Sequence, residues 1–189
     1  VVYAQRCREA YPDANVVIGS IEASLRRIAH YDYWSDKVRR SVLPDSKADL
    51  LIYGNAERAI IALAHRLAVG EAIESIRDLR GTAFMVPRNW LPGADWVEVD
   101  SSDVDAPGPL IRHPNPYERE GEVSCEGVTH QAIRLHTPVK AHKLERSRTA
   151  IRLPAYEQVR DDPVLYAHAS RIFHLESNPG NARALIQAH

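Results

Sequence analysis

The sequence predicts an α/β protein with a partial Rossmann-like parallel sheet, and three observations in its first half support this prediction. Two short runs, residues 16–18 and 49–53, are rich in β-branched or aliphatic residues, as buried strands are. Each run ends in a glycine turn, Gly19-Ser20 or Gly54-Asn55. Helix-spaced apolar residues follow each turn. Two such units in succession favour parallel strands joined by a crossover helix, with both turns at one edge of the sheet.

Helices are predicted before, between and after these two strands. The first precedes Tyr11, the second follows Gly19, and the third begins after Gly54 and ends at Gly70. The apolar face predicted for the second helix comprises Ile21, Leu25 and Ile28. The apolar face predicted for the third helix comprises Ile60, Ile61, Leu63, Ala64 and Leu67.

We divide the sequence into three parts. Residues 1–86 are the Rossmann-like α/β portion, with a third short strand at 81–86. Residues 87–150 are a proline-rich loop region with short strands, in which weak alternation at 128–136 and 149–153 offers one hairpin-like pair. Residues 151–189 supply C-terminal helices.

Two helix starts are predicted in the last part. Asp162 and Pro163 are typical of the N-cap and first position of a helix, which we expect to run to about Glu176. Asn181 is a plausible N-cap for a further helix from Ala182, which the chain end interrupts. Since the chain also begins at Val1 and not at a methionine, we expect an excerpt from a longer protein.

Composition excludes several classes of protein. Lysine and arginine total 24 against 25 aspartates and glutamates, so a formal charge of −1 gives no overall attraction to nucleic acid or an anionic membrane. The 44% hydrophobic content is ordinary for a globular protein and does not indicate disorder. Two cysteines give no disulfide framework, and no apolar run approaches about 18 residues, so we expect a cytoplasmic protein without a membrane span.

The two turns are the predicted ligand-binding crevice. Their backbone N–H groups and the helix ends behind them can bind a phosphate or another polar ligand. Two glutamates in the first turns of the helices should lie near the same crevice. The six candidates are Gly19, Ser20, Glu22, Gly54, Asn55 and Glu57. The alternative is that each glycine only permits a tight turn, since neither turn has the GxGxxG fingerprint.

The charged, aromatic segment between the two units is a candidate interface. Its candidate residues are Arg26, Arg27, Tyr31, Tyr33 and Trp34. Tyrosine, tryptophan and arginine anchor protein interfaces, but they also stack on bases and neutralise phosphates. Asp32 and Asp36 interrupt the basic run, so we favour a protein interface over nucleic acid.

No catalytic or metal-binding residue is predicted in this sequence. The nine histidines include His113, His130, His136 and His142, but these four have neither a partner cysteine nor a HExxH arrangement. Cys125 has no neighbouring base and no second thiol that would make it a nucleophile. We therefore expect these side chains to be packed in the protein or solvated at its surface, and not to be catalytic or metal-binding groups.

A family resemblance is carried by residues 19–37, which read GSIEASLRRIAHYDYWSDK. This segment resembles the one that marks the YgiQ family of radical S-adenosylmethionine (SAM) proteins. Further blocks similar to that family follow in order: 47–58 with its YGNAER core, 151–154 (IRLP), 162–169 (DPVLYAHA) and 176–185 (ESNPGNARAL). One departure is visible, because the family usually has Gly-Gly where this sequence has Gly19-Ser20.

The resemblance implies a larger enzyme. Members of the family have an amino-terminal region similar to a cobalamin-binding Rossmann domain, followed by a radical barrel whose CxxxCxxC motif holds a [4Fe-4S] cluster. Cys7 and Cys125 are far apart and cannot form that motif, so the resemblance places it beyond His189. This chain is then a noncatalytic amino-terminal portion, and its partner is the barrel of the same polypeptide.

The resemblance also implies that SAM and the [4Fe-4S] cluster are cofactors of the whole protein. It does not identify the substrate. A corrinoid is a further cofactor to consider, but the sequence lacks the DxHxxG motif whose histidine binds cobalt in some cobalamin proteins. The alternative function is a small-ligand or protein-binding module without radical chemistry, whose site is the pair of turns at Gly19 and Gly54. A CxxxCxxC motif downstream of this chain discriminates between the two.

Overall fold

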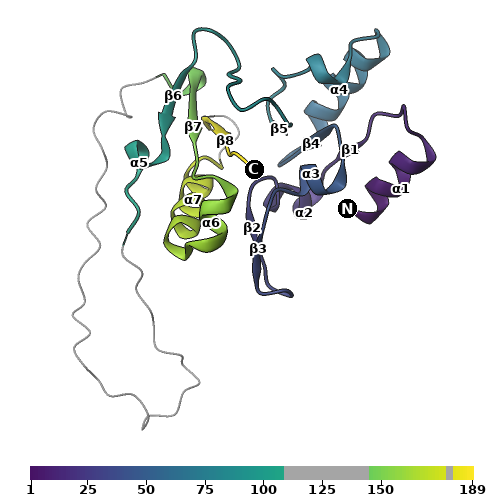
Figure 1. The fold of residues 1–189 in the computed structure, drawn as a ribbon. Helices are drawn as coiled ribbons and strands as arrows, with labels where there is room; N and C mark the ends of the chain where they lie inside the picture. The colour runs from purple at the N-terminus through teal and green to yellow at the C-terminus, as the bar shows by residue number, and fades with distance from the viewer. Residues whose placement is uncertain (109–144, 178–180) are drawn as a thin grey trace, which may run out of the picture.

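The computed structural model describes residues 1–108, 145–177 and 181–189. These residues form an α/β fold with two small sheets, each packed with helices, and a separate two-stranded hairpin (Figure 1). The strand expected at 128–136, Cys125 and the four candidate histidines lie outside the described residues. No described helix is both long and apolar enough to cross a bilayer.

The first sheet has the strand order β1-β4-β5 and confirms the predicted parallel pair. β1 (Val17–Ile18) runs parallel to β4 (Leu50–Ile52). β5 (Thr82–Ala83) lies within the predicted third strand but runs antiparallel to β4. The backbone N–H of Tyr53 donates to the carbonyl of Gly81 (2.8 Å), so the chain enters β5 at the carboxyl end of β4 and runs back along it. The α/β class is confirmed, whereas the Rossmann-like, cobalamin-binding-like detail is not.

Four helices accompany this sheet, and a 3₁₀ helix at Ile73–Ser75 follows them. The four are α1 (Val2–Ala10), α2 (Ser20–Leu25), α3 (Val42–Ser46) and α4 (Glu57–Ala68). α1 is the helix predicted before Tyr11, and Arg8 on it binds Asp49 next to β4 (2.6 Å). α4 ends just before Gly70, which has left-handed backbone (φ +88°), as predicted for a helix end.

The predicted apolar face of α2 is wrong, and that of α4 is confirmed only in part. Helix α2 is only six residues long, so Ile28 lies beyond it and packs against the core of the second sheet, and the other two members of the predicted face point to solvent. In α4 the predicted Leu63 is buried against β4 with Ala59, one helical turn away, and the predicted Leu67 packs against the same cluster. The exposed members of the two predicted faces are Ile21 (76%), Leu25 (62%), Ile60, Ile61 and Ala64.

Strand β4 is buried on both faces, which explains its uninterrupted aliphatic sequence. Leu50 and Ile52 pack on one face with Leu63 of α4. Leu51 packs on the other face with Leu43 of α3. The three strand residues are at most 3% exposed, so β4 is the centre of the first half of the molecule.

The second sheet, β6-β7-β8, is parallel throughout. Its strands are β6 (Val97–Asp100), β7 (Thr149–Arg152) and β8 (Ala184–Ile186). β6 is a short strand inside the proline-rich region. β7 confirms the strand predicted at 149–153, and both of its described partners are parallel strands.

The helix predicted after Asn181 is wrong, because residues 184–186 form β8. A helix of a few residues is barely stable by itself, since its first turn costs more in chain entropy than its hydrogen bonds return. Pairing with β7 instead places β8 beside Ala150 and Ile151, which are fully buried. Tertiary pairing therefore overrides the local helix signal.

The second sheet has four helical segments of its own: α5 (Ser101–Val104), a 3₁₀ helix at Arg146–Arg148, α6 (Tyr156–Asp161) and α7 (Pro163–Leu175). The predicted start of α7 is confirmed. The Asp162 side chain accepts hydrogen bonds from the backbone N–H groups of Val164 (2.8 Å) and Leu165 (3.2 Å). Ile172 of α7 packs against Ile151 of β7 in the core of this half.

A hairpin of β2 (His30–Asp32) and β3 (Lys37–Arg39) joins the two halves. It follows α2 in the chain but packs with the second half, where Val38 lies in one cluster with Val159 of α6. The backbone N–H of Ala29 donates to the side-chain oxygen of Gln187 (2.7 Å), just after β8. Residues from the predicted first part therefore complete the core around the second sheet.

Candidate functional site

The two glycine turns lie side by side at the carboxyl ends of β1 and β4. The Ser24 hydroxyl of α2 donates to the carbonyl of Ser20 (2.8 Å) and accepts from the N–H of Gly54 (3.3 Å). A Cβ on Gly19 would lie 3.2 Å from the carbonyl oxygen of Ile52, which is closer than an ordinary contact. The turns are thus one joined structure, and a side chain at Gly19 would push against the end of β4.

Left-handed backbone occurs in both turns, at Ser20 (φ 79°) and at Gly54 (φ 70°). Glycine adopts such a φ freely, while a side chain makes it cost about 1–2 kcal/mol. The glycine that the family usually has at this position would adopt this φ without strain, whereas Ser20 adopts it at a cost.

The side chains predicted for this crevice are exposed. Glu22 pairs with Arg26 one turn further along the chain (3.2 Å), and Asn55 and Glu57 lie on the surface. None of the six crevice candidates lines the large cleft of the molecule. Ligand binding at the turns stays a prediction.

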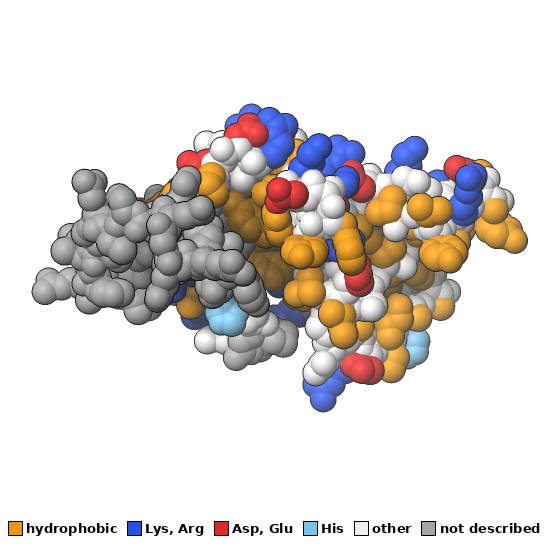
Figure 2. All heavy atoms as spheres, turned by 90° about the horizontal axis from the view of Figure 1, so that it is seen from below, with side chains coloured by type: hydrophobic (Ala, Val, Ile, Leu, Met, Phe, Trp, Pro, Cys, Tyr) orange, Lys and Arg blue, Asp and Glu red, His pale blue; other side chains and the backbone are white. Residues whose placement is uncertain are grey.

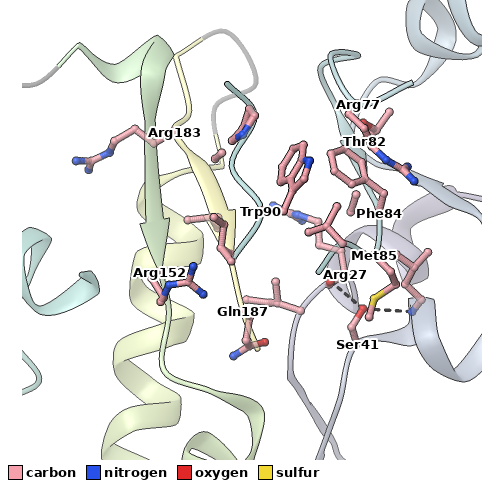
Figure 3. A pocket seen from close by; sticks show the side chains of 18 of the residues that line it. Arg27, Ser41, Arg77, Thr82, Phe84, Met85, Trp90, Arg152, Arg183 and Gln187 are labelled. Carbon is pink, nitrogen blue, oxygen red and sulfur yellow. Dashed lines mark hydrogen bonds between the residues drawn. The ribbon is translucent and has the colours of Figure 1, made fainter. Parts of the chain in front are cut away.

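The large cleft lies between the two halves and has a volume of about 970 Å³. Figure 3 shows its two walls: Arg152 on β7 and Gln187 after β8 on one side, and Phe84, Met85 and Ser41 on the other. Its lining comes from segments far apart in the sequence, so no local motif marks it. A concave site of this size between two packed units is the usual place for a small ligand.

Arg27 lies between the two halves of the molecule, at the cleft lining. Its guanidinium carbon lies 4.2 Å from the ring centre of Tyr53, after β4, and 3.8 Å from that of Phe173, on α7. One of its terminal nitrogens donates to the carbonyl of Ser24 (2.5 Å). Burial lowers the pKa of the Arg27 guanidinium, because the charge is desolvated, and the charge of Tyr53 opposes this effect only in part. This predicted interface residue is found inside the molecule, between its two halves.

Arg77 is a second desolvated arginine in the cleft wall. Its guanidinium carbon lies 4.5 Å from the ring centre of Phe84, and one terminal nitrogen is buried without a hydrogen-bond partner among the described residues. Burial lowers the pKa of Arg77, and the charge of Glu74 opposes that effect only in part. An unpaired buried cation is costly unless something else neutralises it.

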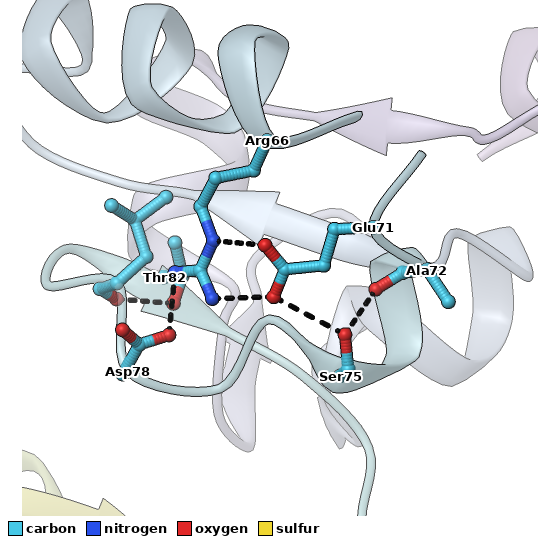
Figure 4. Close-up of polar contacts among 7 residues, drawn as sticks. Arg66, Glu71, Ala72, Ser75, Asp78 and Thr82 are labelled. Carbon is cyan, nitrogen blue, oxygen red and sulfur yellow. Dashed lines mark hydrogen bonds and ion pairs between the residues drawn. The ribbon is translucent and has the colours of Figure 1, made fainter. Parts of the chain in front are cut away.

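A network around Arg66 fixes the segment that carries Arg77 (Figure 4). Arg66 binds both carboxylate oxygens of Glu71 (2.6 Å each) and one oxygen of Asp78 (2.6 Å). The Ser75 hydroxyl adds bonds to Glu71 (3.3 Å) and to the carbonyl of Ala72 (2.7 Å). The pKa of Arg66 is raised by these two carboxylates, so the group stays charged and the segment 71–78 is held from both ends.

The remaining interface candidates are on the surface near the hairpin. Arg26 pairs with Glu22, and the rings of Tyr33 and Trp34 meet edge to face with centres 5.9 Å apart. Trp34 is 91% exposed and Tyr33 78%. Figure 2, which views the molecule from below, shows hydrophobic side chains spread over this face among charged ones. An exposed aromatic tip is consistent with the predicted interface but does not test it.

The sequence reasoning missed most of the cleft. Arg77, Phe84 and Trp90 were not candidates, although residues 77–96 contain three arginines and three aromatic residues. That composition, inside a segment assigned to a loop, is the one signal that could have pointed to a binding wall. His168 was also missed as a buried, chemically notable side chain, since its position on α7 looks like any other helical histidine.

Comparisons with known proteins agree on one family. The whole chain, residues 1–189, matches the family model described as Radical SAM N-terminal. A UPF0313 protein of Chromobacterium violaceum is 60% identical over 197 residues, covering 100% of this chain and 26% of that protein. UPF0313 proteins of Pseudomonas aeruginosa (52%) and Vibrio cholerae (49%) also match the whole chain, which covers 26% and 23% of them. The chain therefore spans about a quarter of the length of these relatives. No solved structure matches it.

Proposed function

This chain belongs to the Radical SAM N-terminal family, as found in UPF0313 (YgiQ-family) proteins, and from this membership we propose that it is the substrate-binding portion of a radical SAM enzyme. The observation that carries the proposal is the cleft of about 970 Å³ between the two sheets. Its aromatic and arginine-rich walls suit a small molecule better than a polymer. The catalytic centre then lies in the other three quarters of the protein.

The residues of this chain do not fit a [4Fe-4S] cluster. A radical SAM cluster needs three cysteines at close spacing, and this chain has only Cys7, exposed on α1, and Cys125. In the whole protein the cluster supplies the reductive cleavage of SAM that begins radical chemistry. No part of that step is assigned to residues 1–189, and the lack of a DxHxxG motif leaves no basis for including a corrinoid.

The role of this chain is to bind and orient a substrate. Arg27 contacts Tyr53 in the first half and Phe173 in the second, so in this proposal it helps to fix the two halves on either side of the cleft. The Arg66 network holds the opposite segment in place. Fixed walls that exclude water favour radical chemistry, because they restrict the orientations in which a reactive intermediate can meet its target.

The exposed hairpin and α2 supply the contact with the rest of the polypeptide in this proposal. Ile21 and Leu25 on α2 and Trp34 at the hairpin tip are large apolar side chains in water, and such groups are enriched at interfaces. The chain has no net positive charge, so it offers no overall electrostatic attraction for nucleic acid at this surface. Two cysteines and no disulfide framework also suit the cytoplasm, which we include in the proposal.

Replacing both cysteines of this chain tests the assignment of the cluster. The full-length protein with Cys7→Ser and Cys125→Ser is purified without oxygen, and its iron content and formation of 5′-deoxyadenosine from SAM are measured. We expect both to equal those of the unaltered protein. The matched control replaces the first cysteine of the CxxxCxxC motif that the family resemblance places downstream, and it should lose both. Loss of the cluster in the double variant would contradict the proposal.

One observation favours the alternative, a ligand-binding module without radical chemistry. The turns at Gly19 and Gly54 are joined through Ser24 at the carboxyl ends of parallel strands, where open α/β folds bind ligands. The same experiment discriminates between the two functions. A full-length protein that holds no cluster and never cleaves SAM would leave this module as the better explanation.

A further inference from the structure

The arginines that line the cleft fall into two groups. Three of them, Arg66, Arg152 and Arg183, each bind a carboxylate within hydrogen-bond distance. The others have no ion pair among the described residues: Arg27, Arg77, Arg80 and Arg88. The acidic side chains in the lining are Asp78, Glu157 and Glu176, and two of these already serve paired arginines. The cleft therefore carries an excess of positive charge that the described residues do not neutralise.

Two of the unpaired arginines are desolvated, which separates them from ordinary surface cations. An arginine in water loses little when it has no partner, because water solvates its charge. Arg27 lies between two aromatic rings, and Arg77 lies against Phe84 with one terminal nitrogen buried and without a hydrogen-bond partner among the described residues. Cation–π contacts offset part of the desolvation cost, but they supply no negative charge. An anion bound in the cleft would supply that negative charge.

The walls between these arginines are flat and aromatic. The rings of Phe84 and Trp90 meet edge to face, with centres 5.4 Å apart and planes at 90°. Figure 3 shows Trp90 in the space between the two walls, with Phe84 beside it. Flat apolar surfaces next to desolvated guanidinium groups bind small molecules that have an apolar body and an anionic end.

Resting on the proposed function, we infer that the ligand of the cleft is a small molecule with an oxyanion group, a phosphate or a carboxylate, and that Arg27 and Arg77 neutralise that group. Arg80 and Arg88 at the same cleft add long-range attraction for an anion. The segment that carries Arg77 is held in place by Arg66, so Arg77 is oriented before the ligand arrives. Preorganisation of this kind lowers the cost of binding.

The test measures oxyanion binding by the full-length protein with calorimetry. Pyrophosphate and citrate are the two anionic probes, which distinguish a phosphate site from a carboxylate site, and adenosine is the neutral control. We expect one of the two anions to bind at a single site, with an affinity that falls as salt rises. Arg77→Gln and Arg27→Gln should each weaken it at least about tenfold, because a hydrogen bond between charged groups is lost.

A matched control and two further variants keep the test decisive. Arg6→Gln removes an exposed arginine on α1, remote from the cleft lining, and should leave the affinity unchanged. Arg77→Lys keeps the charge and should recover part of the binding that Arg77→Gln loses. Equal weakening by Arg6→Gln, or no binding of either anion, overturns the inference. Binding that survives both Arg27→Gln and Arg77→Gln overturns it as well.

The outcome separates this inference from the proposed function. Iron content and 5′-deoxyadenosine formation are measured on the same preparations. If both are normal and neither anion binds, the inference fails while the proposed function stands. If an anion binds through Arg77 but the protein never cleaves SAM, the proposed function fails and the anion site stands.

Discussion

The two sheets of this molecule differ in how visible they are in the sequence. The first is built on β1 and β4, two apolar runs that are each followed by a glycine turn. The second joins β6, β7 and β8, of which β6 has charged residues at two of its four positions and β8 follows a segment that resembles a helix start. The connections from β1 to β4 (residues 19–49) and from β7 to β8 (residues 153–183) are equally long, so the difference teaches that the sequence reveals a sheet when each strand carries its own local signal.

The two halves are also stabilised differently. The first has an apolar centre, with Leu50, Leu51 and Ile52 buried on both faces of β4. The second has a buried ion pair: Glu176, 4% exposed, accepts hydrogen bonds from Arg183 (2.6 Å) and Arg146 (2.7 Å). A carboxylate with several partners fixes the end of α7 against the start of β8. A substitution that removes one member of this ion pair leaves the other member as an unpaired charge in the protein interior.

The largest effect is expected from Glu176→Gln in the second half. The change leaves Arg183, itself buried, without its counter-charge, and breaking such a pair costs about 3–5 kcal/mol. Hydrogen exchange of the full-length protein should speed up in β7 and β8 but not in β4. The matched control is Glu71→Gln, which breaks a partly exposed pair with Arg66 in the first half and should cost much less, because water solvates the charge that is left. Equal costs would remove the contrast between the halves.

The next largest effect compares one apolar residue from each sheet. Leu50→Ala and Ile151→Ala each remove a fully buried aliphatic side chain and should cost about 2–5 kcal/mol. If the halves are separate cores, Leu50→Ala speeds hydrogen exchange in β1, β4 and β5, and Ile151→Ala speeds it in β6, β7 and β8. Faster hydrogen exchange in all six strands after either change would show that the two halves share a single core, which would contradict the comparison between them.

How far each region was predictable follows from its particular residues. In the first half, the aliphatic run at 50–52 and the left-handed glycines at 54 and 70 are signals that act locally, and they predicted β4, its turn and the end of α4. The face of α2 and part of the face of α4 were predicted wrongly because Ile21 and Ile60 look like core residues, and only the packed structure shows that they are exposed.

In the second half the local signals were misleading. Asn181 resembles a helix cap, yet the residues after it extend β7 as β8, since a partner strand outweighs a weak propensity. The cleft was not predictable because its walls come from both sheets. What local patterning did predict were single features, such as the Asp162 cap of α7 and the adjacent turns at Gly19 and Gly54.

A smaller effect is expected from Gly54→Val in the turn after β4. A β-branched residue at φ 70° is strained, and we expect a loss of about 1–3 kcal/mol, although no atom lies within 4 Å of the new Cβ. The neighbouring control, Glu57→Ala, should leave stability unchanged, because that side chain is exposed. Thermal melting of the full-length protein measures both. Equal melting temperatures for the two variants would show that the turn tolerates a side chain.

The smallest effect is a pH dependence confined to the second half. His168 is 4% exposed and neither ring nitrogen has a hydrogen-bond partner in the described residues, so burial lowers its pKa below the usual 6.5. The charges of Asp100 and Asp105 oppose this shift, and that of Arg171 adds to it. In the unfolded chain the ring takes up a proton near pH 6.5, while in the folded protein it stays neutral. Stability is therefore full above pH 6.5 and falls as the pH drops, by up to about 1.4 kcal/mol per unit.

His168→Leu tests this pH dependence, because the variant has no proton to take up. Between pH 7.5 and 5.5 the denaturant midpoint of the wild type should fall further than that of the variant, whichever protein is more stable at pH 7.5. Hydrogen exchange should locate the difference in α7 and not in α4. If the stabilities of the two proteins changed in parallel with pH, His168 would not contribute to the pH dependence of stability.

The most direct test of the central claim measures where the cleft lies relative to the radical centre. If the cleft binds the substrate, it must face the cluster that cleaves SAM, because the reacting groups have to meet. Nitroxide labels are placed at Arg80→Cys, in the cleft lining, and at Arg6→Cys, on α1 beyond the far side of the first sheet (Figure 1), in a Cys7→Ser, Cys125→Ser background. Electron paramagnetic resonance then gives the distance of each label from the reduced cluster of the full-length protein. The account predicts that the label at position 80 lies nearer to the cluster, and a shorter distance from position 6 would contradict it.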